Sequence, residues 1–282
     1  MILPRLFALP DAIIGATYLV GYVLLDSISF IHPHAGYDIT PWYPPTGLSF
    51  VVVLAFGRRM IPYLFVAALL ADVIVRQLPF SWALEFAIIA SIGGGYSLGL
   101  LFLMRPKTRF NLARFSTRDL SLLLGTAAAT AAFVASSFVG AMIAAGLVPV
   151  KDFFSASLRF WVGDMIGIAV VAPFGLMALT RQPLLKLSLE TAAQFAAILI
   201  ALAMVFGFPE EQYFQLFYIL FLPIIWMAVR AGLPGVTFGI LVAQLGLIIG
   251  VQLNGNSISG SNAHLGHNRF GGGRGGHRAT SH

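Results

Sequence analysis

The sequence predicts an all-α fold: a polytopic integral membrane helical bundle with about eight or nine transmembrane segments of roughly 20 apolar residues each, and no soluble domain. Of the 282 residues, 58% are hydrophobic and only 10% are charged, whereas a soluble domain carries about 25% charged residues. The mean hydropathy is +0.87. Apolar stretches follow one another from residue 11 to residue 253, and no long polar block between them could fold alone.

Each apolar stretch is assigned to one span. The expected spans are 11–31, 44–56, 60–75, 82–104, 119–146, 158–179, 192–208, 213–229 and 233–253. The segment 44–56 is short, so it either spans the bilayer or re-enters on one side. The first stretch is longer than the apolar core of a signal peptide and lacks a clear small-residue cleavage site, so we expect it to remain as a helix.

Basic residues between the spans predict the orientation, because Lys and Arg favour the cytoplasmic side of a membrane. With the N-terminus inside, the loop 105–118 and its basic residues lie in the cytoplasm, while the outer segments before the tail carry only Arg76, Lys151 and Arg159. The net charge of +6 therefore reflects topology and not nucleic-acid binding. The chain has no cysteine, which excludes disulfides and thiolate metal sites.

Small residues along the expected helices predict close packing, because residues four apart share a helix face and small side chains let backbones approach. Glycine pairs with this spacing are Gly95 and Gly99, Gly163 and Gly167, Gly235 and Gly239, and Gly246 and Gly250. The longest row, here called the small-residue row, consists of Ala128, Ala132, Ser136, Gly140 and Ala144. We expect this row to pack inside the bundle, with homodimer formation as the alternative.

The stretch Trp42-Tyr43-Pro44-Pro45-Thr46-Gly47 interrupts a membrane-length apolar region. Two adjacent prolines release backbone groups that hydrocarbon cannot satisfy, so such a break needs protein or a water-filled cavity around it. It is therefore a place to look for a binding site. The alternative is a simple interfacial turn, in which Trp and Tyr lie at headgroup level and the prolines begin a helix.

Six charged residues lie within or at the ends of the expected spans, all toward the outer side under this topology. They are Asp26, Asp72, Arg76, Glu85, Arg159 and Asp164. Intramembrane charges usually face a bundle interior or an aqueous cavity. Asp72 and Arg76 are four apart and can pair on one helix. Asp164 has no such partner, and Asp26 and Glu85 are expected to reach the headgroups.

These observations lead to one site hypothesis, an outward-opening polar and aromatic pocket that binds a ligand. Its expected lining residues are Trp42, Pro44, Pro45, Thr46, Asp72, Arg76, Trp161 and Asp164. Within it, Asp72, Arg76 and Asp164 would form a network across two helices. The alternative is that this network only clamps the helices together. No catalytic residue, metal ligand or cofactor is predicted.

Two motifs, in order along the chain, resemble those of a known family. The first runs from Trp42-Tyr43-Pro44-Pro45-Thr46-Gly47 through Gly57-Arg58-Arg59-Met60-Ile61-Pro62 to Asp72, and the second is Phe160-Trp161-Val162-Gly163-Asp164-Met165-Ile166-Gly167. Together they resemble the bacterial membrane-associated sensor domain called MASE, first type, over roughly residues 10 to 255. The family usually has asparagine where this chain has Asp72.

The resemblance implies a sensory input module in the bacterial cytoplasmic (inner) membrane. Relatives carry a histidine kinase of a two-component system, or a diguanylate cyclase or phosphodiesterase of cyclic-di-GMP signalling, after the last span. This chain has no motif of those domains, so we expect no enzyme activity and an action through an output domain in cis or a cytoplasmic partner. The stimulus would be a small ligand or a membrane protein, and the resemblance names neither.

The sequence changes character after Leu253. Residues 1–253 form the expected sensor domain, and residues 254–282 form a Gly-, His- and Arg-rich tail expected to be disordered. A truncated or frame-shifted gene would explain this tail, and an orphan sensor or a re-entrant 44–56 is the alternative. The tail histidines His264, His267, His277 and His282 match no zinc spacing.

Two other functions compete with the sensor. A small-solute transporter or channel would use the Pro-Pro break and the charged residues as its path, although carriers favour internal repeats and charges near the midplane. An intramembrane enzyme would need a His-Glu or Ser-His arrangement, whereas every histidine lies in an outer loop or the tail. Expected partners are the lipid bilayer and a signalling protein, with a homodimer as an option and no nucleic acid.

Overall fold

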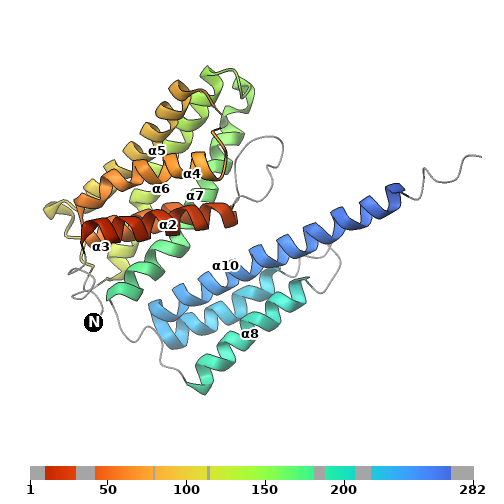
Figure 1. Cartoon of the computed structure of the whole chain (residues 1–282). Coiled ribbons are helices and arrows are strands. Elements are labelled where there is room, and N and C mark those ends of the chain that lie inside the picture. The colour runs from red at the N-terminus through yellow and green to blue at the C-terminus, as the bar shows by residue number, and fades with distance from the viewer. Residues whose placement is uncertain are drawn as a thin grey trace, which may run out of the picture.

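The computed structural model of the chain describes residues 10–29, 42–78, 80–112, 115–180, 188–206 and 217–267. These residues form eight α-helices and no strand (Figure 1). The helices are α2 (Asp11–Ser29), α3 (Pro44–Phe56), α4 (Ile61–Ile74), α5 (Trp82–Leu103), α6 (Thr117–Ala144), α7 (Phe153–Thr180), α8 (Leu189–Phe206) and α10 (Phe221–His267). The predicted all-α fold class is confirmed.

Six of the helices are long and apolar enough to cross a membrane, by length and composition: α2, α5, α6, α7, α8 and the apolar part of α10. The two others, α3 and α4, have 13 and 14 residues. At 1.5 Å per residue each is about 20 Å long, which is less than the hydrocarbon thickness of about 30 Å. The segment 44–56 is thus a short helix, and it lies inside the bundle.

The expected span 213–229 falls on the short 3-10 turn Phe217–Leu220 and on the start of α10, and its residues 213–216 lie outside the described residues. The last expected span, 233–253, lies within α10. The chain bends sharply between the two spans at Gly232, where φ is 63° and ψ is −155°. A residue without a side chain adopts this left-handed φ at little cost. Pro234 follows and cannot donate a backbone hydrogen bond. The bend therefore lies where the sequence separates the two spans.

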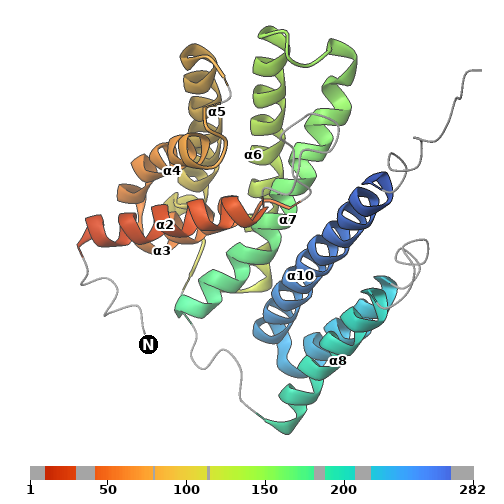
Figure 2. The same cartoon turned by 45° about the vertical axis from the view of Figure 1, so that its right-hand side comes forward.

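The main core surrounds α3. Ten of the thirteen residues of α3 are buried, because it packs against α7 while α2 and α5 also contact it. Fully buried side chains at the centre of this core include Phe50, Leu100, Leu123 and Ile168. A second cluster joins α8 to α10 through Ile198, Leu202, Val205, Leu220 and Met227. Helix α7 contacts both parts, and both views show α8 and α10 side by side (Figures 1 and 2).

The small-residue row on α6 does not pack inside the bundle, so this prediction is wrong. Ala132, Ser136 and Ala144 are exposed, and a Cβ at Gly140 would meet no described atom within 4 Å beyond its chain neighbours and the adjacent backbone of its own helix. The buried small residues of α6 are Ala127, Ala131 and Ala135, which form the neighbouring row. The two rows have the same spacing and similar residues, so the rotation of α6 about its axis decides which of them faces inward. The side-chain pattern does not determine that rotation.

The glycine pairs do mark close helix contacts. A Cβ on Gly95 or Gly99 would lie 2.4 Å from side-chain atoms of α6. A Cβ on Gly246 would lie 2.3 Å from Leu202 of α8. The closest approach is at Gly167 of α7, where an added Cβ would lie 2.0 Å from the backbone oxygen of Tyr43. The predicted intramolecular packing is therefore correct at these positions.

Candidate functional site

The Pro-Pro segment is the start of α3, and it is packed against α7. Pro44 and Pro45 occupy the first turn of the helix, where no backbone donor is needed. The backbone N–H before them, that of Tyr43, donates to the oxygen of Gly163 at 3.1 Å. Trp42, Pro44, Pro45 and Thr46 are all buried. The prolines begin a helix, as the interfacial-turn interpretation expects, and the segment is buried by protein, as the binding-site interpretation expects.

Asp164 lies on α7 beside this junction and is 2% exposed. Its two carboxylate oxygens accept hydrogen bonds from different helices: Tyr96 of α5 donates to Oδ2, and Thr46 of α3 donates to Oδ1 at 3.3 Å. Asp164 therefore finds its partners on other helices, as its isolation on its own helix predicts. It joins α3, α5 and α7 at one point.

Arg76 follows the last turn of α4 and forms two ion pairs. One nitrogen is 3.2 Å from Asp72, one turn earlier, and another is 2.9 Å from Asp26 of α2. The predicted Asp72–Arg76 pair is confirmed. The predicted network omitted Asp26, which is fully buried. The expectation that Asp26 reaches the headgroups is wrong, because α2 turns this carboxylate toward α4.

Glu85, in the first turn of α5, is also buried, with 1% of its surface exposed. Its Oε1 accepts the backbone N–H of Phe80 at 3.3 Å. Its carboxyl group lies close enough to that of Asp72 for the two to interact electrostatically. The expectation that Glu85 reaches the headgroups is therefore wrong as well.

The turn after α4 directs these groups inward. Gln77 and Leu78 have φ of 58° and 53°, a left-handed conformation that costs free energy in residues other than glycine. The N–H of Leu78 returns to the oxygen of Asp72 at 2.8 Å. This turn reverses the chain directly after Arg76, and Phe80 follows it. Local backbone strain thus accompanies the placement of a buried guanidinium.

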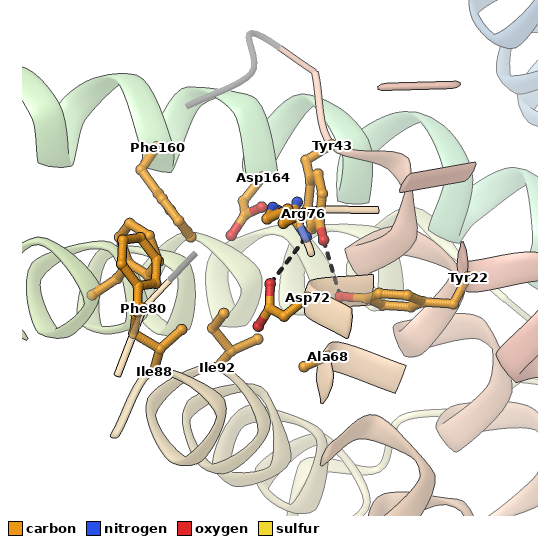
Figure 3. Close-up of a pocket in the computed structure, with 11 residues that line it drawn as sticks. Tyr22, Tyr43, Ala68, Asp72, Arg76, Phe80, Ile88, Ile92, Phe160 and Asp164 are labelled. Atoms are coloured by element: carbon orange, nitrogen blue, oxygen red, sulfur yellow. Dashed lines mark hydrogen bonds and ion pairs between the residues drawn. The ribbon is translucent and has the colours of Figure 1, made fainter. Parts of the chain in front are cut away.

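These elements enclose a cavity of about 60 Å³, which is enough for a few water molecules or one small solute. Figure 3 shows Asp72, Arg76 and Asp164 in the middle of this site. Phe80, Phe160, Ile88 and Ile92 form an apolar wall on one side, and Tyr22, Tyr43 and Ala68 lie on the other. Phe138 of α6 completes the lining. The cavity is therefore charged at its centre and largely aromatic around it.

The structure brings together only part of the predicted pocket. Asp72, Arg76 and Asp164 line the cavity, and Thr46 contacts Asp164 from outside the lining. Trp161 points elsewhere, because its Nε1 donates to the backbone oxygen of Ala128 on α6 at 2.9 Å. Trp42, Pro44 and Pro45 are buried near the α3–α7 contact but are not among the lining residues.

Sequence reasoning missed the tyrosines of the site. Tyr22 and Tyr43 join their hydroxyls at 3.2 Å, and Tyr18 joins Ser49 at 2.7 Å. Tyr18, Tyr22 and Asp26 recur every four residues on α2. That spacing places three polar groups on one face of an otherwise apolar helix, and it is the signal that could have indicated the face of α2 turned toward the site.

Among the described side chains, no group of three or more His, Asp or Glu residues is arranged to hold a metal ion. The tail histidines lie outside those described side chains.

Comparison with known families gives one result. The family model of MASE1 matches residues 11–264, which is most of the chain and includes every helix of the site. No curated protein and no solved structure matches the chain. The match extends beyond residue 253, and α10 continues to His267, while residues 268–282 lie outside the described residues. The domain boundary at 253 therefore stays a prediction.

Proposed function

This chain belongs to the MASE1 family of membrane-associated sensor domains, and from this premise we propose that its cavity is the input site of a bacterial sensory module. In this proposal a small ligand enters the cavity from the outer side of the cytoplasmic membrane. The module then acts on an output domain in cis or on a cytoplasmic signalling partner. The N-terminus lies in the cytoplasm, in keeping with the basic loop 105–118.

One observation carries the proposal: the cavity lies where α2, α4, α5, α6 and α7 meet, and it is lined by a buried charged network. Buried charges in a membrane protein are costly and are usually retained for a function. A ligand in contact with several helices has a different interaction free energy in each arrangement of those helices. Such a difference is what a ligand needs in order to shift a conformational equilibrium.

Helix α7 offers a route from the cavity to the second half of the bundle. It carries Asp164 in the site and Pro173 about two and a half turns later, and a proline within a helix is a common position for bending. Directly after it, the ring of Phe174 lies 5.4 Å from that of Phe238 on α10. A change at Asp164 would therefore reach α10 through one continuous helix.

Access to the cavity can be tested with one introduced cysteine, because the chain has none of its own. Ala68 lines the cavity and is 3% exposed. We expect Ala68→Cys in the full chain to react in intact cells with the membrane-impermeant reagent trimethylammonioethyl methanethiosulfonate. Ala127→Cys, at a fully buried position where α6 faces the main core, is the matched control and should not react. If the thiol at position 68 reacts only after the cells are opened, the outward-facing input site is wrong.

The same variant tests whether occupancy of the site is transmitted. Amide hydrogen exchange of the purified full chain in lipid nanodiscs is compared before and after labelling of the thiol at position 68. A sensor should show changed protection in α7 and in α10, which does not line the cavity. Changes confined to the helices of the cavity contradict the proposal. Flux of labelled solutes into proteoliposomes would instead favour the transporter alternative.

A further inference from the structure

We propose that the cavity takes a small organic cation of the ammonium type, held by the carboxylates of Glu85 and Asp72. This inference rests on the proposed function of the cavity as an input site, and it names the chemical class of the ligand. Three observations carry it: the balance of buried charges, an unpartnered carboxylate oxygen, and the aromatic wall of the cavity.

The buried charges of the site are unequal. Four carboxyl groups lie inside the bundle: Asp26, Glu85 and Asp164 are 0%, 1% and 2% exposed, and the side chain of Asp72 is 13% exposed. Among the residues that the structure describes, Arg76 is the cation that faces them, and it is shared between Asp26 and Asp72.

The other basic residue on the adjacent part of α7, Arg159, is exposed and does not line the cavity. Burying a charged carboxylate without a cation costs several kcal/mol, roughly as much as the whole stability margin of a small protein. A second positive charge is therefore required before all four carboxylates can be charged inside the bundle at an acceptable free-energy cost.

Of these buried carboxyl groups, Glu85 has the weakest hydrogen-bond donors to offset the cost of its burial. Asp164 receives two hydroxyl donors, whereas Glu85 receives one long backbone hydrogen bond, on Oε1, and its other polar contact is with another carboxyl group, that of Asp72. Its Oε2 is buried and has no hydrogen-bond partner among the described residues, and the same holds for Oδ2 of Asp26. Glu85 itself is not a lining residue, but its carboxyl group contacts that of Asp72, which lines the cavity, so we infer that its unpartnered oxygen can be reached from the acidic side of the cavity. A cation with N–H or polarised C–H groups would satisfy it.

The walls of the cavity distinguish an organic cation from a metal ion. A hard metal ion requires several oxygen ligands, and the described side chains form no group of three suitable ligands. Aromatic faces attract ammonium groups and exclude water from them. Phe80 and Phe160 lie on one side of the charged centre and Tyr43 on the other (Figure 3). An ammonium group between these rings would contact both carboxylate and aromatic surface.

An anionic ligand fits the site less well. The guanidinium of Arg76 would be its anchor, but this group already forms ion pairs with two carboxylates at 2.9 and 3.2 Å. An anion would have to displace one of them and approach Glu85 and Asp164 as well. Like charges at such distances repel strongly in a low-dielectric interior.

Charge selectivity at position 68 provides the first test. Reaction rates of the Ala68→Cys full chain are measured with trimethylammonioethyl methanethiosulfonate and with its anionic counterpart, sulfonatoethyl methanethiosulfonate. The ratio of the two rates is normalised to the same ratio for Val150→Cys, at a position that is 74% exposed. We expect the cation to be favoured at least tenfold and the preference to fall toward one when Glu85→Gln is added. Glu190→Gln, in an exposed pair with Arg230 on α8, is the matched control and should leave it unchanged.

A second test measures how far a bound cation protects the thiol at position 68 from the labelling reagent. It leaves every carboxylate in place, in case Glu85→Gln does not fold. Tetramethylammonium chloride should slow the labelling of Ala68→Cys at least threefold relative to sodium chloride of equal ionic strength. Suppose that the thiol reacts in intact cells and that its labelling changes hydrogen exchange in α7 and α10, but that labelling is equally fast in sodium chloride and in tetramethylammonium chloride. The input site then stands and the cation class is wrong. Because lower pH slows the labelling of any cysteine by protonating its thiolate, the pH dependence is normalised to that of Val150→Cys. Extra protection of Ala68→Cys at lower pH would identify the proton as the neutralising species and would also overturn this assignment.

Discussion

The hydroxyl of Thr46 lies 3.3 Å from Oδ1 of Asp164 and only 2.7 Å from the backbone oxygen of Tyr43. A threonine hydroxyl has one hydrogen to donate, so the two acceptors share it and the nearer one takes the larger part. Tyr96 is consequently the main donor to Asp164. The carboxyl group of Asp164 is thus hydrogen-bonded mostly from α5, although α3 is the helix packed most closely on α7.

This relationship predicts unequal effects for the two donors. Tyr96→Phe removes the main donor from a buried carboxyl group and should lower the free energy of unfolding by about 1–3 kcal/mol, whereas Thr46→Val should cost about 1 kcal/mol or less. Thermal or denaturant unfolding of the full chain in detergent measures both. Tyr63→Phe, whose hydroxyl makes no hydrogen bond among the described residues, is the control. Equal stability of Tyr96→Phe and the wild type would contradict this account of Asp164.

The α3–α7 contact predicts a strict requirement for glycine. An alanine Cβ at position 167 would lie 2.0 Å from the backbone oxygen of Tyr43, and one at position 47 would lie 2.5 Å from that of Gly167. Backbone atoms cannot move aside as flexible side chains do, so Gly167→Ala should cost roughly 3 kcal/mol, near the upper end of overpacking effects. Gly125→Ala, in open space on α6, should be neutral or stabilising. Unchanged stability of Gly167→Ala would show that the helices are farther apart.

The two rows of small residues on α6 predict opposite responses to the same substitution. Ala131 is fully buried, so Ala131→Leu should separate α6 from its neighbours and lower the melting temperature. Ser136→Leu and Gly140→Leu should leave the melting temperature nearly unchanged, because Ser136 is exposed and nothing lies close to Gly140. The three variants add similar apolar volume and differ in position. Destabilisation by Ser136→Leu alone would indicate that this face is covered in the membrane by a second chain.

The sequence predicted the helices well because their signal is local. Apolar length gives the extent of each helix, and Gly232 with Pro234 marks the bend in α10. The Asp72–Arg76 pair was also predictable, since residues four apart on one helix meet whatever surrounds them. Glycine pairs marked real contacts because a glycine has no side chain to face lipid.

The remaining site residues depend on helix rotation and on contacts between helices. Glu85 and Tyr96 lie on α5, which is apolar on every side, so periodicity does not show which face turns inward. Trp161 has the right spacing to share a face with Asp164, yet its ring turns to α6 and donates to Ala128. Hydrogen bonding across helices therefore decided its direction.

The orientation of the chain in the membrane decides to which side the cavity opens. The loop 105–118 is basic and should face the cytoplasm, while the loop 147–157, just before the half of α7 that carries Asp164, should face outside. Asn111→Cys and Asp152→Cys introduce single cysteines in these loops, and the substitution at 111 leaves its backbone hydrogen bond to Asp119 in place. An impermeant thiol reagent should label Asp152→Cys in intact cells and Asn111→Cys only in permeabilised ones. The reverse pattern would invert the molecule and open the cavity to the cytoplasm, so that the ligand of this sensor would be a cytoplasmic solute.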